Sequence, residues 1–133
     1  MADVKFKRPI SPHLSIYALS PTMVMSIVHR ITGAALYFGT LLLALWLLAV
    51  SGSVSEFDFA SRFFGSWFGQ FILLGYTWAL LHHMLGGIRH LIWDTGRALD
   101  KTSIEVLAWL TIISSTALTI LIWVAGYALR GGS

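Results

Sequence analysis

Three long apolar segments constrain the fold of this 133-residue chain more than any other feature of its sequence. Residues 31–50, 63–81 and 106–129 are 20, 19 and 24 residues long. A helix needs about 20 mostly apolar residues to cross the hydrocarbon core of a bilayer, where lipid offers exposed backbone no hydrogen-bond partner. The sequence therefore predicts an all-α membrane protein with three transmembrane helices.

The composition argues against a soluble domain of this size. Only 11% of the residues are Asp, Glu, Lys or Arg, whereas an ordinary globular domain is about 25% charged. The chain has no cysteine, which excludes disulfides, thiolate metal sites and cysteine nucleophiles. A bound metal or cofactor must therefore be held by histidine, carboxylate or backbone groups. The net charge of +3 and the scattered basic residues indicate no nucleic-acid partner.

We expect one transmembrane domain whose helices extend beyond the apolar cores of the three segments. The predicted spans cover about 23–50, 63–94 and 104–129, after an interfacial lead-in at 1–22. The stretches around 51–62 and 95–103 are predicted to be short loops. We therefore expect most of the chain to be surrounded by membrane lipid.

The basic residues predict the orientation, because cytoplasmic loops are rich in Lys and Arg. Arg62 and Arg130 fall on one side of the membrane. Seven of the nine basic residues fall on the other: Lys5, Lys7, Arg8, Arg30, Arg89, Arg97 and Lys101. The N-terminus is thus predicted to be cytoplasmic and the C-terminus to lie opposite. The first residues resemble neither a signal peptide nor a transit peptide, which favours a bacterial inner membrane over a mitochondrial one.

The second predicted span carries several ionisable residues, each costing roughly 2.5–3.5 kcal/mol at the centre of a membrane helix. Steps of 4, 7 and 11 residues nearly complete whole helical turns. One face of the span therefore carries His83, Gly87, His90 and Asp94. His82 and Arg89 point away from this face.

Two interpretations of this face are open on the residues alone. Glycines can admit a neighbouring helix closely while histidines hydrogen-bond across the contact. Alternatively, the glycines make room for a flat cofactor whose metal is ligated by a histidine. His83 and His90 are about 10.5 Å apart along the axis, too far to ligate one iron from both sides. A second axial ligand must then come from another helix or another subunit, and His29 beside Arg30 suits haem propionates better.

The first span has a polar face at its cytoplasmic entrance. It consists of Ser26, Arg30, Gly33 and Tyr37. A hydroxyl and a guanidinium one turn apart can both donate hydrogen bonds to a carbonyl headgroup or a carboxylate. The alternatives are that Arg30 only anchors the end of the helix and that Ser26 hydrogen-bonds its own backbone.

Two carboxylates, Asp94 and Asp100, flank the end of the second span. They can relay protons, or they can be solvated or paired with Arg97 or Lys101. His13 lies between Pro12 and Leu14 and is interpreted as a surface histidine.

Three motifs occur in order along the chain. They are RPISPHLSIY at 8–17, SIVHRITG at 26–33 and HMLGGIRHLIWDTG at 83–96. Together with the three-span topology, they resemble the larger cytochrome b membrane-anchor subunit of succinate dehydrogenase, also called complex II. The last two match the family patterns S-x-x-H-R-x-[ST] and H-x-x-x-G-x-R-H-x-x-x-D residue for residue. The resemblance implies an anchor of succinate:ubiquinone oxidoreductase, which serves both the respiratory chain and the tricarboxylic acid cycle.

The resemblance also implies roles for individual residues. His83 would be an axial ligand of a b-type haem whose second ligand comes from the smaller anchor subunit. Ser26 and Arg30 would contact the ubiquinone headgroup, and Arg30 with nearby His29 would face the haem propionates. Asp94 would deliver protons to the reduced quinone.

The implied partners carry the rest of the reaction. Succinate would be oxidised on a flavoprotein subunit, and electrons would reach quinone through an iron–sulfur subunit. This chain is therefore expected to have no activity alone. Two alternatives are a fumarate reductase anchor and a haem-free structural or assembly protein. The motif RPISPHLSIY and the single matched haem histidine favour the succinate-oxidising enzyme over the former.

Overall fold

The computed structural model describes residues 13 and 19–131, and in that part of the chain the regular structure is helical. The helices are α1 (Pro21–Ser51), α2 (Val54–Gly65), α3 (Trp67–Asp94) and α4 (Lys101–Gly131). Three of them, α1, α3 and α4, are long and apolar enough to cross a membrane. The prediction of an all-α membrane protein with three spans is confirmed. Most of the predicted interfacial lead-in, 1–22, lies outside the described residues.

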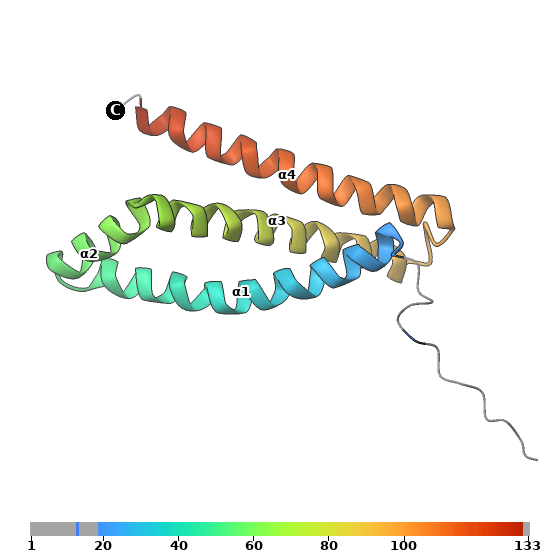
Figure 1. Cartoon of the computed structure of the whole chain (residues 1–133), viewed down its shortest axis with the longest axis horizontal. Coiled ribbons are helices and arrows are strands. Elements are labelled where there is room, and N and C mark those ends of the chain that lie inside the picture. The colour runs from blue at the N-terminus through green and yellow to red at the C-terminus, as the bar shows by residue number, and fades with distance from the viewer. Residues whose placement is uncertain (1–12, 14–18, 132–133) are drawn as a thin grey trace, which may run out of the picture.

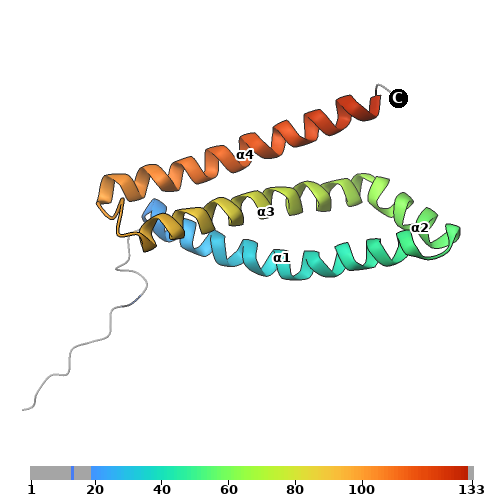
Figure 2. The ribbon, with the colours of Figure 1, turned by 180° about the vertical axis from the view of Figure 1, so that it is seen from behind.

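Helix α3 lies between α1 and α4 in both views of the ribbon (Figures 1 and 2). It contacts each of the other helices, and α1 also contacts α4. The start of α1, the end of α3 and the start of α4 lie at one end of the molecule, which we call the Pro21 end (Figure 1). Helix α2 and the C-terminal end of α4 lie at the opposite end. That the Pro21 end faces the cytoplasm stays a prediction.

The long helices begin and end at residues that satisfy their terminal backbone groups. The Ser20 side chain accepts a hydrogen bond from the Met23 N–H at 3.3 Å, and Pro21 occupies the first position, where its missing N–H costs no bond. After α3, Gly96 adopts a φ of +74° and its N–H bonds the Trp93 carbonyl at 2.8 Å. This left-handed conformation favours glycine and turns the chain out of the helix.

Helix α2 occupies most of the stretch around 51–62 that the sequence predicts to be a loop. A capping box starts it: the Ser53 hydroxyl accepts from the Glu56 N–H, and Glu56 bonds back to the Ser53 N–H at 2.6 Å. This reciprocal arrangement satisfies two helix-terminal donors at once. The helix then buries Ala60 and ends at Gly65, so the following span begins at Trp67 and not at Phe63.

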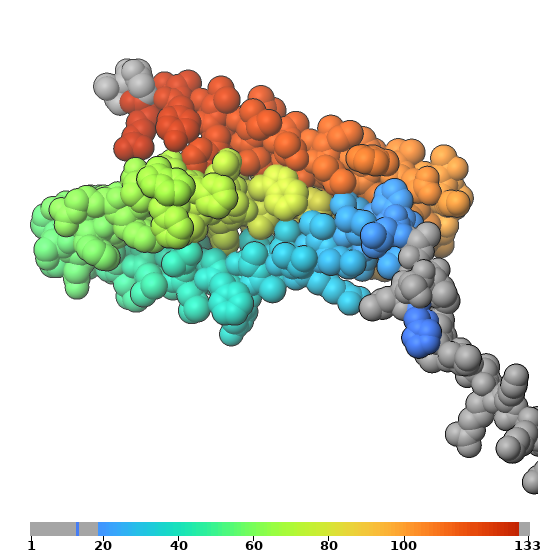
Figure 3. Space-filling view, viewed as in Figure 1, coloured from blue at the N-terminus to red at the C-terminus, as the bar shows by residue number. Residues whose placement is uncertain are grey.

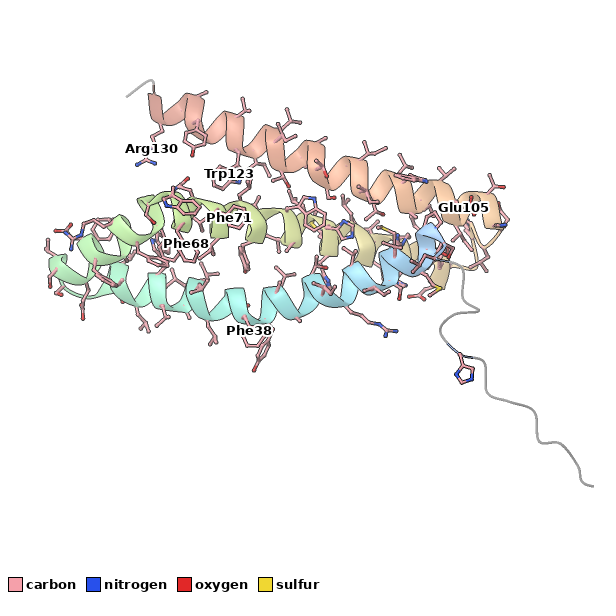
Figure 4. All side chains as sticks on the ribbon, in the orientation of Figure 1. Phe38, Phe68, Phe71, Glu105, Trp123 and Arg130 are labelled. Atoms are coloured by element: carbon pink, nitrogen blue, oxygen red, sulfur yellow. The ribbon has the colours of Figure 1, made fainter. Side chains whose placement is uncertain are left out.

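Polar side chains connect the first half of α3 to the second half of α4. The bonds join Tyr127 Oη to Gln70 Oε1 at 3.1 Å, Trp123 Nε1 to Thr77 Oγ1 at 3.3 Å, and Trp78 Nε1 to Thr116 Oγ1 at 3.2 Å. Figure 4 shows Trp123 pointing from α4 toward α3. Hydrogen bonds and small residues commonly join helices in lipid, because apolar burial alone cannot distinguish protein from hydrocarbon.

The outer surface is apolar, as lipid contact requires. Phe38 is 65% exposed and projects from α1 away from the other helices (Figure 4). Helix α4 covers one edge of α3 in the space-filling view (Figure 3). At the Pro21 end α1 also reaches α4, and Met25 and Ala108 are buried there.

Candidate functional site

Three histidines meet where α3 packs against α1 near the Pro21 end, and we call them the histidine cluster: His29, His83 and His90. The rings of His29 and His83 are stacked, with centroids 4.0 Å apart and planes inclined by 5°. The ring of His90 lies 5.5 Å from that of His29, centroid to centroid. The cluster joins one histidine of the first span to two histidines of the predicted polar face of α3.

A hydrogen bond to the backbone sets the proton position on His83. Its Nδ1 lies 3.1 Å from the carbonyl oxygen of His29, and the Thr32 hydroxyl is 3.4 Å away. A carbonyl oxygen only accepts, so Nδ1 carries the proton, and in the neutral imidazole Nε2 keeps its lone pair. Metal-ligating histidines usually bond their second ring nitrogen in this way. The His83 imidazole is therefore held in a tautomer whose Nε2 can accept a bond.

The glycines beside the histidine cluster allow close contact between α1 and α3. A Cβ atom on Gly33 would lie 3.0 Å from His83 Cε1, and one on Gly86 would lie 2.5 Å from His29 Nδ1. No atom lies within 4 Å of the corresponding position at Gly87. The helix-packing interpretation therefore applies to Gly33 and Gly86, while Gly87 leaves open surface one turn beyond His83.

His82 has different surroundings from its neighbour. It is 1% exposed, its Nδ1 lies 3.3 Å from the Ser115 hydroxyl of α4, and its ring is stacked on Trp78 at 4.8 Å. Arg89 also lines the α3–α4 contact. The structure thus agrees that His82 and Arg89 point away from the face that carries His83.

The His29 side chain has an unusual feature, because its Nδ1 is buried without a hydrogen-bond partner in the described part of the chain. Buried polar nitrogens in proteins are nearly always bonded. Among the same residues, no three His, Asp or Glu side chains converge as metal ligands. A metal at His83 would therefore take its other ligands from a porphyrin or from another chain.

Ser26 and Arg30 are both exposed on α1 near the Pro21 end. Within residues 19–131 the Ser26 hydroxyl makes no hydrogen bond to its own helix, unlike Thr32 and Thr40, which bond carbonyls one turn earlier. The hydroxyl is available to a ligand. Gly33 differs from the prediction, because it faces His83 instead of sharing the exposed face. A ligand held by Ser26 and Arg30 would have to be enclosed by another chain or by lipid.

The two carboxylates at the end of α3 have separate environments. Asp94 is exposed on the last residue of the helix. Asp100 instead caps α4, accepting a hydrogen bond from the Ser103 N–H at 2.9 Å. The bonds from Ser103 hold the pKa of Asp100 below its ordinary value, so this carboxylate stays ionised at neutral pH and has a structural role. His13 is exposed, as expected.

The contribution of α1 to the His83 environment is not evident from the sequence. The His29 carbonyl and the Thr32 hydroxyl both approach His83, yet neither stands out by residue type. The only available indication is the small pair Thr32-Gly33, which follows His29 by about one turn and marks a face that can pack closely.

The chain is similar over most of its length to known membrane subunits. The sequence profile described as "Succinate dehydrogenase/Fumarate reductase transmembrane subunit" matches residues 5–122. The succinate dehydrogenase cytochrome b556 subunit of Paracoccus denitrificans is 41% identical over 122 residues, 91% of this chain and 94% of the relative. The subunit of the same name from Rickettsia felis is 37% identical, covering 92% of this chain and 95% of the relative. The mitochondrial succinate dehydrogenase cytochrome b560 subunit of Bos taurus is 40% identical, covering 87% and 72%.

Proposed function

Because this chain belongs to the family of succinate dehydrogenase/fumarate reductase transmembrane subunits, as a cytochrome b anchor of succinate dehydrogenase, we propose that it ligates one b-type haem and forms part of a ubiquinone-reduction site. The haem is shared with a smaller anchor subunit. Succinate is oxidised on a flavoprotein subunit, and an iron–sulfur subunit passes the electrons on. The chain itself attaches these subunits to the bacterial inner membrane.

The observation that carries the proposal is the hydrogen bond from His83 Nδ1 to the His29 carbonyl. It orients the imidazole and leaves Nε2 as the ligating atom. A b-type haem held there supplies one-electron redox chemistry, with a potential that depends on its burial and on hydrogen bonding around its ligands. The unpartnered Nδ1 of His29 and the guanidinium of Arg30 are the groups of this chain suited to the haem propionates.

Ser26 and Arg30 act on the quinone. A neutral and a cationic donor one helical turn apart can both bond a quinone carbonyl. Fixed donors of this kind stabilise the negative charge that develops on the carbonyl oxygen as electrons arrive. Asp94, exposed at the end of α3, delivers protons to the reduced quinone. The second wall of this pocket belongs to a partner subunit.

The proposal is tested by the absorption difference between the reduced and oxidised complex. His83→Ala is expected to abolish the signal of a low-spin haem with two histidine ligands. His82→Ala is the matched control, because it removes a neighbouring imidazole that faces α4. It lowers stability by removing the bond to Ser115, but the signal per assembled complex should be nearly unchanged.

The reverse pattern would assign the ligand to His82. A wild-type complex without any b-type signal would favour the haem-free structural protein. The relatives described above are named for succinate dehydrogenase, which supports this enzyme over a fumarate reductase anchor.

A further inference from the structure

Arg89 is a buried cation for which the proposed haem and quinone sites provide no role. It lies on the α4 side of α3 and is 5% exposed. Its guanidinium carbon lies 5.1 Å from the centroid of the Trp93 ring. In the described part of the chain, Arg89 Nε and Trp93 Nε1 are both buried without a hydrogen-bond partner.

The chemistry of these two atoms indicates what each of them lacks. Arginine and the indole N–H are donors only, so the group missing from Arg89 Nε is an acceptor. Of the two residues, only Arg89 lines a cavity between α3 and α4. No carboxylate within residues 19–131 forms an ion pair with Arg89. A charge in a membrane span is costly unless it is paired or reaches the interface. The compensating group is therefore an anion from outside this chain.

The space beside Arg89 has the character of a lipid site. A cavity of about 130 Å³ lies between α3 and α4, and Arg89 lines it. Apolar side chains form most of its walls, and two hydroxyl residues complete them: Leu85, Ile88, Ile92, Leu107, Leu110, Thr111 and Ser114. Apolar walls around one cation complement an amphiphile with a negative headgroup better than they complement a free, fully hydrated anion.

The position of Arg89 along α3 is suitable for contact with a lipid headgroup. It precedes the end of α3 at Asp94 by five residues, about 7.5 Å along the helix axis. Arg97 and Lys101 are exposed in the α3–α4 connection at the same end. Basic residues near the membrane surface attract anionic lipid. We propose that the α3–α4 groove binds an anionic phospholipid, with its phosphate on Arg89 and an acyl chain against the apolar walls.

Two other anions are less consistent with the geometry. A haem propionate would lie on the His83 side, where α3 faces α1, whereas Arg89 faces α4. An acidic side chain of a partner subunit would not use the apolar walls. Arginine bonds a phosphate through two parallel N–H groups. Both the charge and the planar shape of the guanidinium therefore contribute to phosphate binding.

The test measures lipid retained by the full chain, purified in detergent together with its native partner subunits. After exchange into a neutral detergent, mass spectrometry of the extracted lipid should find anionic phospholipid in the wild type. Arg89→Gln should reduce it about tenfold, since a charge-assisted bond of this kind contributes about that factor in affinity. Arg62→Gln, which removes an exposed charge at the opposite end of the molecule, should leave the amount unchanged. Arg89→Lys should retain an intermediate amount.

A second measurement does not depend on the folding of any variant. Wild-type complex stripped of lipid is placed in phosphatidylcholine nanodiscs with or without phosphatidylglycerol, or given inorganic phosphate. We expect phosphatidylglycerol alone to raise the Tm. An equal rise with inorganic phosphate would identify a free-anion site and overturn the lipid proposal. No retained anionic lipid in the wild type, or loss of the haem signal without loss of lipid in Arg89→Gln, would also overturn it.

Discussion

At the scale of single residues, adjacent positions on α3 have opposite surroundings. His83 faces the His29 carbonyl on α1, and His82 is enclosed between Trp78 and Ser115 against α4. A step of 100° per residue separates them just enough to reach two different neighbours. Both residues are histidines, so the difference between their hydrogen bonds comes from the helix that each imidazole faces.

Arg30 provides a prediction at the same scale. Arg30→Ala should reduce the rate of quinone reduction by about a hundredfold, because a donor to a developing negative charge is lost. Electron transfer to a soluble acceptor that takes electrons upstream of the membrane should be nearly unchanged. Both rates are measured on the same purified complex.

Arg97→Ala is the matched control, because it removes another exposed arginine at the Pro21 end. It should leave both rates intact. Equal losses of the two activities in Arg30→Ala would show an assembly defect and contradict a role at the quinone.

Helical periodicity was sufficient to separate His83 from His82, and the motif matches supplied the roles proposed for Ser26 and Arg30. The stack of His83 on His29 was not predictable, because it depends on side-chain rotamers and on how closely α1 approaches α3. Likewise, the position of Asp100 in the sequence is compatible with a proton relay. Its capping role depends on where α4 begins, three residues before the predicted start.

At the scale of elements, α2 offers a pH-dependent prediction. Hydrogen bonds from the Ser53 backbone and hydroxyl hold the pKa of Glu56 below its ordinary 4.5. A lowered pKa means that the ionised carboxylate stabilises the helix above pH 4.5, and that this stabilisation is lost as the pH falls through the folded-state pKa. Amide hydrogen exchange at the start of α2 should therefore become faster in acid, relative to the middle of α4.

The Glu56→Ala variant is the control for this effect. It should exchange faster at the start of α2 at every pH and lose the extra acid dependence. An unchanged acid dependence in this variant would show that another group is responsible.

A close approach between α1 and α3 gives a second prediction for elements. A Cβ atom on Gly39 would overlap the Tyr76 ring, so Gly39→Ala should lower stability by about 1–3 kcal/mol through overpacking. Thermal unfolding in detergent measures it. Gly75→Ala, where no atom lies within 4 Å of the new Cβ, should be neutral or stabilising, since alanine favours helix. Similar losses in both variants would contradict the contact.

The presence of three long apolar helices was predictable from length and hydropathy. The predicted bounds 23–50, 63–94 and 104–129 lie within four residues of the ends of α1, α3 and α4. Helix α2 was not predicted, because Glu56, Asp58 and Arg62 among its twelve residues are typical of a polar connection between spans. The S-x-x-E pattern at Ser53 was the available indication of a helix start. Apolar residues at Phe57, Ala60 and Phe64 supported the same conclusion.

At the scale of the whole molecule, the chain presents two kinds of surface. The exterior of the three spans is rich in large apolar side chains, including Phe38 and Leu45. The buried positions include a set of polar side chains: Thr32, His82, Arg89, Thr111, Ser115 and Thr119. This distribution is the reverse of a soluble protein and follows from the bilayer as solvent. The exposed Ser26 and Arg30 are exceptions, because they place polar side chains on the outer surface of a span.

The central position of α3 also has a consequence for biosynthesis. It is the least apolar of the three spans, and its polar groups are covered by α1 on one side and α4 on the other. When α3 leaves the ribosome, α1 is already available to receive His83, but the partner of His82 has not yet been translated. A nascent chain halted before α4 would thus present an uncovered imidazole to the translocon, and release into lipid would have to wait for the last helix.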